Sequence, residues 1–314
     1  MLRSVKLVVV IMVVLFVADR LIYQVISTLD DDIYTGLAVG KINSFLKRKD
    51  DVDVLVFGSS RAAHHVDLEE LGVPNFNAGQ DATKIGFASA LIATLKKRGQ
   101  TIIVHIDHDE LYDNDYDGQS DAQLLAFHAL KNDEIGSFFN NYFKEEWVLG
   151  KIAHSYAANG KILSILKNSV SKGHDYAAQN GYEPLIPTEE QSETFRQIMS
   201  KGIADPIQEK VEMNKVNLKS EKFIDHIIRK AKTNESKLVF FTSPSLLRID
   251  RDTKNRTQAF FKAKGIPYWD HGAFFDSLEY TDWKDETHLS DKGAKKYSAY
   301  LRGELLHYLN GAFK

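Results

Sequence analysis

Short apolar runs that end in small or polar residues alternate along the chain with stretches of helical periodicity. Five such runs predict β-strands, at residues 53–57, 74–77, 101–106, 237–242 and 266–270. Runs that are short and almost wholly apolar are typical of strands buried on both faces of a parallel sheet. Helical patterns separate or follow them, at residues 83–97, at 253–264 and from residue 289 to about 310. The alternation predicts an α/β fold with a three-layer arrangement, a parallel sheet flanked by helices.

The first residues have a different pattern, an unbroken apolar run from residue 7 to 18 behind Arg3 and Lys6. A membrane span needs about 20 largely apolar residues, and snorkelling of Lys6 and Arg20 brings this run near that length. A cleaved signal peptide is the alternative, but no small-x-small cleavage site precedes Asp19. We therefore expect an uncleaved transmembrane helix, with the positive residues in the cytoplasm and the rest of the chain outside.

The remaining pattern divides the chain into a few segments. We expect a membrane anchor at residues 1–26, a membrane-proximal stalk at 27–50 and an α/β domain at 51–314. Within that domain, residues 119–235 are rich in helix formers and lack strand alternation, which predicts a helical insertion at about these positions.

Composition narrows the function classes. The chain has 314 residues, of which 43% are hydrophobic and 26% charged, as in an ordinary globular protein. Its formal net charge of −3 gives no reason to propose a nucleic-acid partner. The absence of cysteine excludes disulfides, thiol chemistry and cysteine-based zinc sites. No cofactor is predicted.

Candidate chemistry lies at the two ends of the α/β pattern. Gly58-Ser59-Ser60 follows the first predicted strand, where the chain turns at the carboxyl edge of the sheet and ligands usually bind. Asp285 and His288 lie three residues apart in a polar loop before the last helix. A carboxylate that orients an imidazole, which in turn faces a serine, is the arrangement of a catalytic triad.

Together with Asn77-Ala78-Gly79 after the second strand, these residues resemble the SGNH (GDSL-like) hydrolase superfamily, whose fold is flavodoxin-like. The Gly-Ser-Ser-Arg block is most similar to its membrane-anchored branch. Members of that branch O-acetylate exported polysaccharides or transfer D-alanine to teichoic acids. The resemblance covers roughly residues 50–110 and 236–310.

The resemblance implies roles for matching positions. Ser60 would be the nucleophile, His288 the general base and Asp285 its orienter, while the amides of Ser60 and Gly79 would form the oxyanion hole. The family's third block usually offers an Asn to the oxyanion, but here the third strand runs into residues 105–109, His-Ile-Asp-His-Asp.

Other polar residues near these blocks could bind substrate or serve the fold. Arg61 and Asn77 are candidate substrate-binding residues, and Arg61 could equally pair with a structural carboxylate. His64 and His65 are adjacent, so on a helix they would not face each other, and we interpret them as loop or surface histidines.

An acidic stretch follows the third strand, and its Asp113, Asp115, Asp117 and Gly118 match the start of an EF-hand loop. The twelfth position is Leu124 in place of the bidentate Glu. An acidic, solvated loop is therefore favoured over a calcium site, and no metal is assigned.

These features predict a membrane-anchored, extracytoplasmic serine esterase or O-acyltransferase, and the resemblance implies that it acts on acyl esters of cell-envelope or exported polysaccharide. Expected partners are the membrane, the acylated glycan and a membrane-embedded acyl-transfer protein. Two alternatives belong to other classes: a catalytically weak scaffold of an envelope polysaccharide complex, which the missing third-block Asn favours, and a calcium-dependent glycan-binding module.

Overall fold

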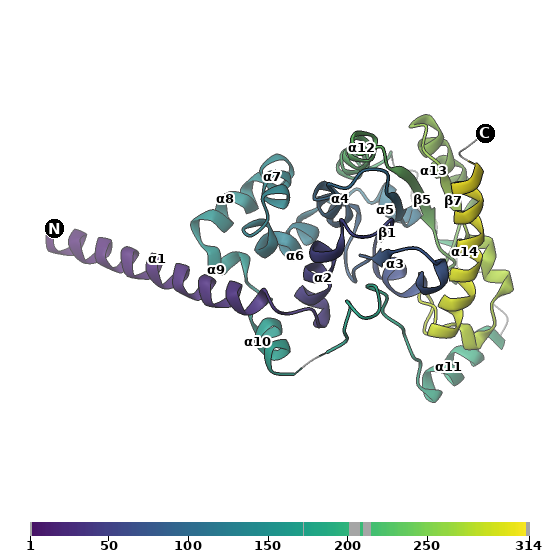
Figure 1. The fold of residues 1–314 in the computed structure, drawn as a ribbon, viewed down its shortest axis with the longest axis horizontal. Coiled ribbons are helices and arrows are strands. Elements are labelled where there is room, and N and C mark those ends of the chain that lie inside the picture. Colours follow the sequence, from purple (N-terminus) through teal and green to yellow (C-terminus); the bar gives the residue numbers. More distant parts are fainter. Residues whose placement is uncertain (1, 172, 201–207, 210–214, 312–314) are drawn as a thin grey trace.

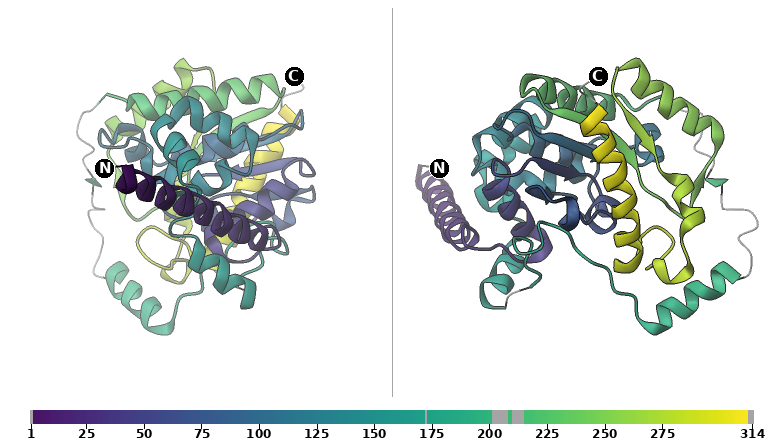
Figure 2. Two further views of the ribbon diagram at one scale, coloured as in Figure 1. Left: turned by 90° about the vertical axis from the view of Figure 1, so that its left-hand side faces the viewer. Right: turned by 45° about the vertical axis from the view of Figure 1, so that its right-hand side comes forward.

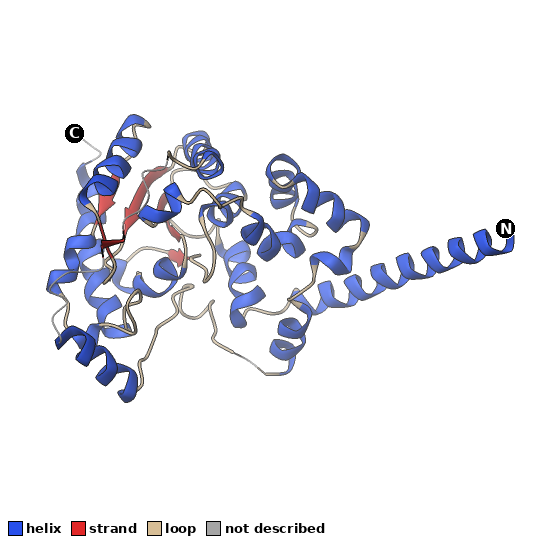
Figure 3. Cartoon of the chain, turned by 180° about the vertical axis from the view of Figure 1, so that it is seen from behind, coloured by secondary structure: helices blue, strands red, loops and turns tan. Residues whose placement is uncertain are grey.

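A five-stranded parallel sheet organises the protein. The computed structural model describes residues 2–171, 173–200, 208–209 and 215–311. The strand order is β2-β1-β3-β5-β7, and every neighbouring pair is parallel. The sheet, red in Figure 3, consists of β1 (Val54–Phe57), β2 (Asn75–Asn77), β3 (Thr101–His105), β5 (Lys237–Thr242) and β7 (Tyr268–Asp270). All five predicted strands and the α/β fold class are thereby confirmed.

Helices cover both faces of the sheet (Figure 1). Those that precede or separate the strands are α2 (Lys41–Arg48), α3 (Ser60–His65), α4 (Ile85–Ala93), α5 (His108–Tyr112), α12 (Leu218–Thr233) and α13 (Arg251–Ala263). The chain closes with α14 (Asp291–Gly311). A second, minor pairing joins β4 (Gln208–Glu209) to β6 (Arg248–Ile249).

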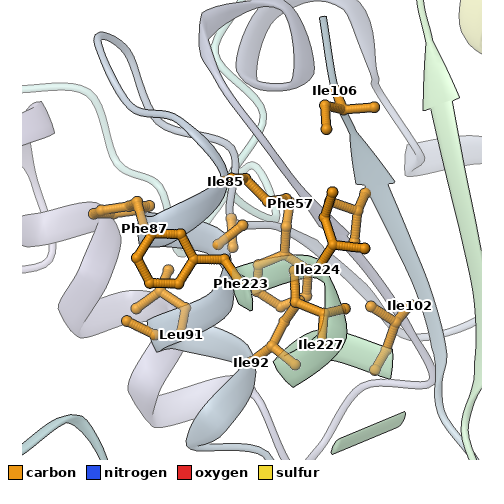
Figure 4. Close-up of a cluster of buried hydrophobic side chains, with 14 of the residues drawn as sticks. Phe57, Ile85, Phe87, Leu91, Ile92, Ile102, Ile106, Phe223, Ile224 and Ile227 are labelled. Atoms are coloured by element: carbon orange, nitrogen blue, oxygen red, sulfur yellow. The ribbon is translucent and has the colours of Figure 1, made fainter. Parts of the chain in front are cut away.

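Alternate residues of each strand point into two separate cores, as the period of two requires. Leu55 and Phe57 of β1 belong to the core that α2, α4 and α12 cover, and Figure 4 shows Phe57 among side chains of these layers. Val54 and Val56 belong to the opposite core, which α3 and α14 cover. The result is the three-layer arrangement that the alternation predicts.

The N-terminal helix α1 (Leu2–Asp30) extends away from the body, as Figures 1 and 2 show. Its apolar side chains from residue 7 to 17 are between 47% and 64% exposed. In its second half, α1 is bonded to the helical insertion: the Asp19 carboxylate accepts the amides of His154 and Ser155, and Arg20 donates to the Lys151 carbonyl. Within the described residues, no helix combines the length and apolar composition that a membrane crossing requires, so the predicted transmembrane anchor is not supported.

The segment predicted as a stalk is part of the α/β domain. Residues 36–40 form one π-helical turn and lead directly into α2. Ile42 and Phe45 of α2 are at most 2% exposed and lie in the main core beside Phe57. An amphipathic helix with such a buried face covers the sheet, so the domain begins before residue 51.

The predicted insertion is helical but shorter than expected. Its described helices are α6 (Gln119–Ala129), α7 (Asp133–Tyr142), α8 (Lys144–Ile152), α9 (His154–Ala157), α10 (Ile162–Val170) and α11 (Glu189–Ser200). Helix α12 does not belong to it, because Phe223, Ile224 and Ile227 pack against the sheet core (Figure 4). Part of the predicted range, residues 172, 201–207 and 210–214, lies outside the described residues.

Candidate active site

Ser60 stands at the start of α3, immediately beyond β1. Gly58 makes the turn with a φ of +139°, and a side chain there would place its Cβ 2.7 Å from the Cβ of His105. Only glycine fits both the backbone angle and the close approach to β3. The sharp turn leaves the Ser60 side chain at the carboxyl edge of the sheet, where it lines a cavity.

The structure brings Ser60, His288 and Asp285 together. The Ser60 Oγ lies 2.8 Å from Nε2 of His288, although 228 residues separate them. The other ring nitrogen, Nδ1, lies 3.0 and 3.1 Å from the two carboxylate oxygens of Asp285. This is the connectivity of a nucleophile, a base and an orienting carboxylate.

The loop that carries His288 is held by its own backbone. Trp283 and Leu289 form an antiparallel bridge, and the Lys284 amide donates to the His288 carbonyl at 2.9 Å. The Asp285 carboxylate also accepts the Thr287 and His288 amides, each at 2.9 Å. Burial raises the pKa of Asp285, but hydrogen bonds from His288 and these amides outweigh it and hold the pKa below its ordinary value.

The second acid of the loop, Asp282, has a structural role. It is fully buried, its carboxylate accepts the Glu279 amide at 2.8 Å, and Lys296 pairs with it at 2.6 Å. Its carboxylate therefore fixes the turn before the loop, and Asp285 is the acid that contacts His288.

The cavity beside Ser60 has a volume of about 400 Å³ and a mostly polar lining. Acidic and basic groups both contribute, among them Asp107, Asp270, Arg61 and Lys254. Such a volume holds a small ligand, and this lining suits hydroxyl and ester groups better than a long alkyl chain. None of the described insertion residues lines it.

Arg61 lines the same cavity but is already paired. Its guanidinium donates to the Asp107 carboxylate and to the Ser243 carbonyl. Burial raises the pKa of Asp107, and the charges of Arg61 and neighbouring histidines bring it below the ordinary value. Asp107 follows β3, and it is paired with Arg61 at the position where the third block was expected.

Asn77 and Gly79 do not line the cavity beside Ser60. Asn77 is 2% exposed; its Nδ2 donates to the carbonyls of Ala62 and Val66, and its Oδ1 accepts the Gly79 amide at 2.9 Å. In this structure the Gly79 amide is therefore bonded to Asn77, and the side chain of Asn77 is bonded to the backbone of the protein. Glycine is needed at 79 for packing, since a Cβ there would lie 2.6 Å from the Ala63 nitrogen of α3.

Both histidines of α3 are buried, contrary to our interpretation as loop or surface residues. The ring of His64 meets that of His288 edge-on, with 5.8 Å between centroids. Its Nε2 lies 2.9 Å from the Asp81 carboxylate and its Nδ1 2.8 Å from the Glu183 carbonyl. Burial lowers the pKa of His64, but Asp81 outweighs it and the net pKa is raised. Helical spacing offered a signal, because Ser60 and His64 are four residues apart and share a face.

The acidic stretch does not form a metal site in the described part of the chain, where no three acidic or histidine side chains converge as ligands. Asp113 pairs with Lys84, and the Asp113 and Asp117 carboxylates accept the amides of Asp115 and Gln119. Two of the three candidate ligands, Asp113 and Asp117, therefore serve turns and an ion pair.

Models of known protein families and curated proteins were both compared with this chain, and neither comparison gives a match.

Proposed function

We propose that this protein is a serine-dependent acyl-transfer enzyme of the SGNH type, either an esterase or an O-acyltransferase. The observation that supports it best is the continuous hydrogen-bonded chain from Ser60 through His288 to Asp285 at the edge of a polar cavity. The proposed substrates are acyl esters of cell-envelope or exported polysaccharide, as the family resemblance implies.

In the proposed reaction, Ser60 Oγ attacks the carbonyl carbon of the ester while His288 Nε2 takes its proton. Asp285 stabilises the imidazolium that forms and keeps Nδ1 protonated. The proton then passes from Nε2 to the leaving alcohol, and an acyl-serine remains. Water or a sugar hydroxyl, deprotonated by His288, attacks the acyl-serine and restores Ser60.

The negative charge that develops on the carbonyl oxygen needs hydrogen-bond donors. The Ser60 amide is in the first turn of α3, where amides have no partner within the helix, and it is the donor that remains of the two predicted. The second predicted donor, Gly79, is already bonded. This shortage favours the second candidate function, a catalytically weak scaffold of an envelope polysaccharide complex.

Covalent labelling with a serine-directed phosphonate separates the two functions. We expect the wild-type protein to be labelled at Ser60, and Ser60→Ala to abolish both labelling and hydrolysis of small acetyl esters while the fold is retained. A wild type that is labelled but does not hydrolyse these esters would indicate transfer to another acceptor. A folded wild type that is neither labelled nor active would refute the enzyme proposal and leave the scaffold.

A further inference from the structure

Ser243 connects two residues of α3 to the end of the sheet. Arg61 and His65 are four residues apart and lie on the same face of α3, and both reach Ser243, which directly follows β5. Nδ1 of His65 lies 2.9 Å from the Ser243 hydroxyl, and the same hydroxyl lies 3.1 Å from Nε2 of His105. His65, Ser243 and His105 are at most 2% exposed, so these contacts are buried.

The other nitrogen of His65 determines its protonation. Nε2 accepts the backbone amide of Leu289 at 3.0 Å. A backbone N–H can only donate, so Nε2 must carry a lone pair and the proton of the neutral ring must be on Nδ1. That proton is then donated to the Ser243 hydroxyl.

Leu289 directly follows His288, and the peptide that joins them is held at both ends. Its carbonyl oxygen, on His288, accepts the Lys284 amide at 2.9 Å, and its N–H, on Leu289, donates to His65. The plane of this peptide sets where the Cα of His288 lies, and hence where Nε2 meets Ser60. A misplacement of about 1 Å at a reacting group can lower a rate about 10²-fold.

We infer that His65 is a positioning residue, which in its neutral form holds the His288–Leu289 peptide and so aims His288 at Ser60. The inference rests on the proposed function of Ser60 and His288. His65 belongs neither to the proposed triad nor to the proposed oxyanion hole.

Two substitutions separate this role from a general need for a buried polar side chain. In His65→Gln, the side-chain oxygen can take the position of Nε2 and still accept the Leu289 amide. In His65→Asn, the shorter amide can take the position of Nδ1, so the Ser243 contact is kept and the Leu289 contact is lost. We expect His65→Gln to be labelled by the phosphonate within a few-fold of wild type, and His65→Asn about 10²-fold more slowly.

His226→Asn is the matched control. His226 is half-buried on α12, and its Nδ1 lies 2.9 Å from the Ser89 hydroxyl, a contact of the same type and length on the opposite face of the sheet. Its labelling rate should equal that of wild type. Equal rates for His65→Gln and His65→Asn would overturn the inference.

Two measurements do not depend on activity and so distinguish this inference from the proposed function. Hydrogen exchange of the Leu289 amide should stay slow in His65→Gln and become faster in His65→Asn. In the wild type, ¹⁵N-histidine NMR should show His65 with its proton on Nδ1, and a proton on Nε2 would refute the inference even if neither variant folds. An unlabelled wild type with the expected exchange pattern would instead refute the enzyme proposal alone.

Discussion

The turn at Ser60 and the turn at Asn77 follow adjacent parallel strands and look equally functional in sequence, yet the fold uses them in opposite ways. Ser60 lines the cavity, and its hydroxyl is hydrogen-bonded to the side chain of His288. Asn77 lies one strand away, and its amide group makes three hydrogen bonds to the backbone around α3. The turn at Ser60 presents its polar group to the cavity, whereas the polar group at Asn77 is hydrogen-bonded inside the protein.

The difference shows what a polar residue at a sheet edge needs before it can do chemistry. Its position after a strand is not sufficient, because buried backbone groups nearby compete for its hydrogen bonds. Asn77 satisfies the carbonyls of Ala62 and Val66, and by doing so it holds α3, the helix that presents Ser60. Substitutions on the cavity side should therefore change rate, and those on the buried side should change stability.

The largest expected effect is on the cavity side, at Asp285. Asp285→Asn keeps a hydrogen bond to His288 but loses the charge and favours the wrong tautomer, so turnover should fall about 10⁴-fold, as the equivalent change does in a serine protease. The thermal midpoint should change little, because the Asp285 side chain is half exposed. Ester turnover measured beside thermal unfolding tests both expectations.

Asp282→Asn is the control within the same loop. It removes the charge that pairs with Lys296 in a fully buried place, so it should lower stability and leave the rate per folded molecule close to wild type. A near-normal rate for Asp285→Asn would contradict the proposed triad.

The next largest effect is a loss of stability, on the buried side at Asn77. Asn77→Ala removes the partners of two carbonyls and of the Gly79 amide, and an unsatisfied buried group costs about 1–3 kcal/mol. We expect a loss of at least about 3 kcal/mol in the free energy of unfolding, which denaturant titration measures. Ser60→Ala is the matched change in the adjacent turn and should stay within about 0.5 kcal/mol of wild type. An Asn77→Ala protein as stable as wild type but defective in substrate binding would restore the predicted role of Asn77.

The different uses of the Ser60 and Asn77 turns could be predicted from the sequence only in part. The five strands and the contacts of His288 with Ser60 and Asp285 followed from period, order and motif, because these signals are local or depend only on strand ends meeting at one edge. The uses of Asn77 and Gly79 depend on which carbonyls α3 brings near, and no local pattern records that. The same is true of Asp19, whose carboxylate binds amides 135 and 136 residues away.

The end of the third strand gives an effect that is spread over several pH units and is small near neutral pH, and it tests the boundary between the cavity side and the buried side. His105, the last residue of β3, is buried against the Phe241 ring and the Ser243 hydroxyl, and its Nε2 lies 3.9 Å from the Asp107 carboxylate. Burial lowers the pKa of His105 to about 3; Asp107 opposes this shift and Arg61 adds to it. An unfolded histidine titrates near about 6.5. Between these two values the unfolded chain binds the extra proton, so stability should fall as pH decreases from about 6.5 toward 3, by up to about 1.4 kcal/mol per pH unit.

His105→Gln keeps a hydrogen-bonding group for Ser243 but cannot be protonated, and its unfolding free energy should depend less steeply on pH in this window. His307→Gln, an exposed position on α14, should keep the wild-type slope. If the unfolding free energy of His105→Gln depends on pH as steeply as that of wild type, the fold does not need His105 to be neutral. The end of β3 would then present a group to the cavity, as the end of β1 does.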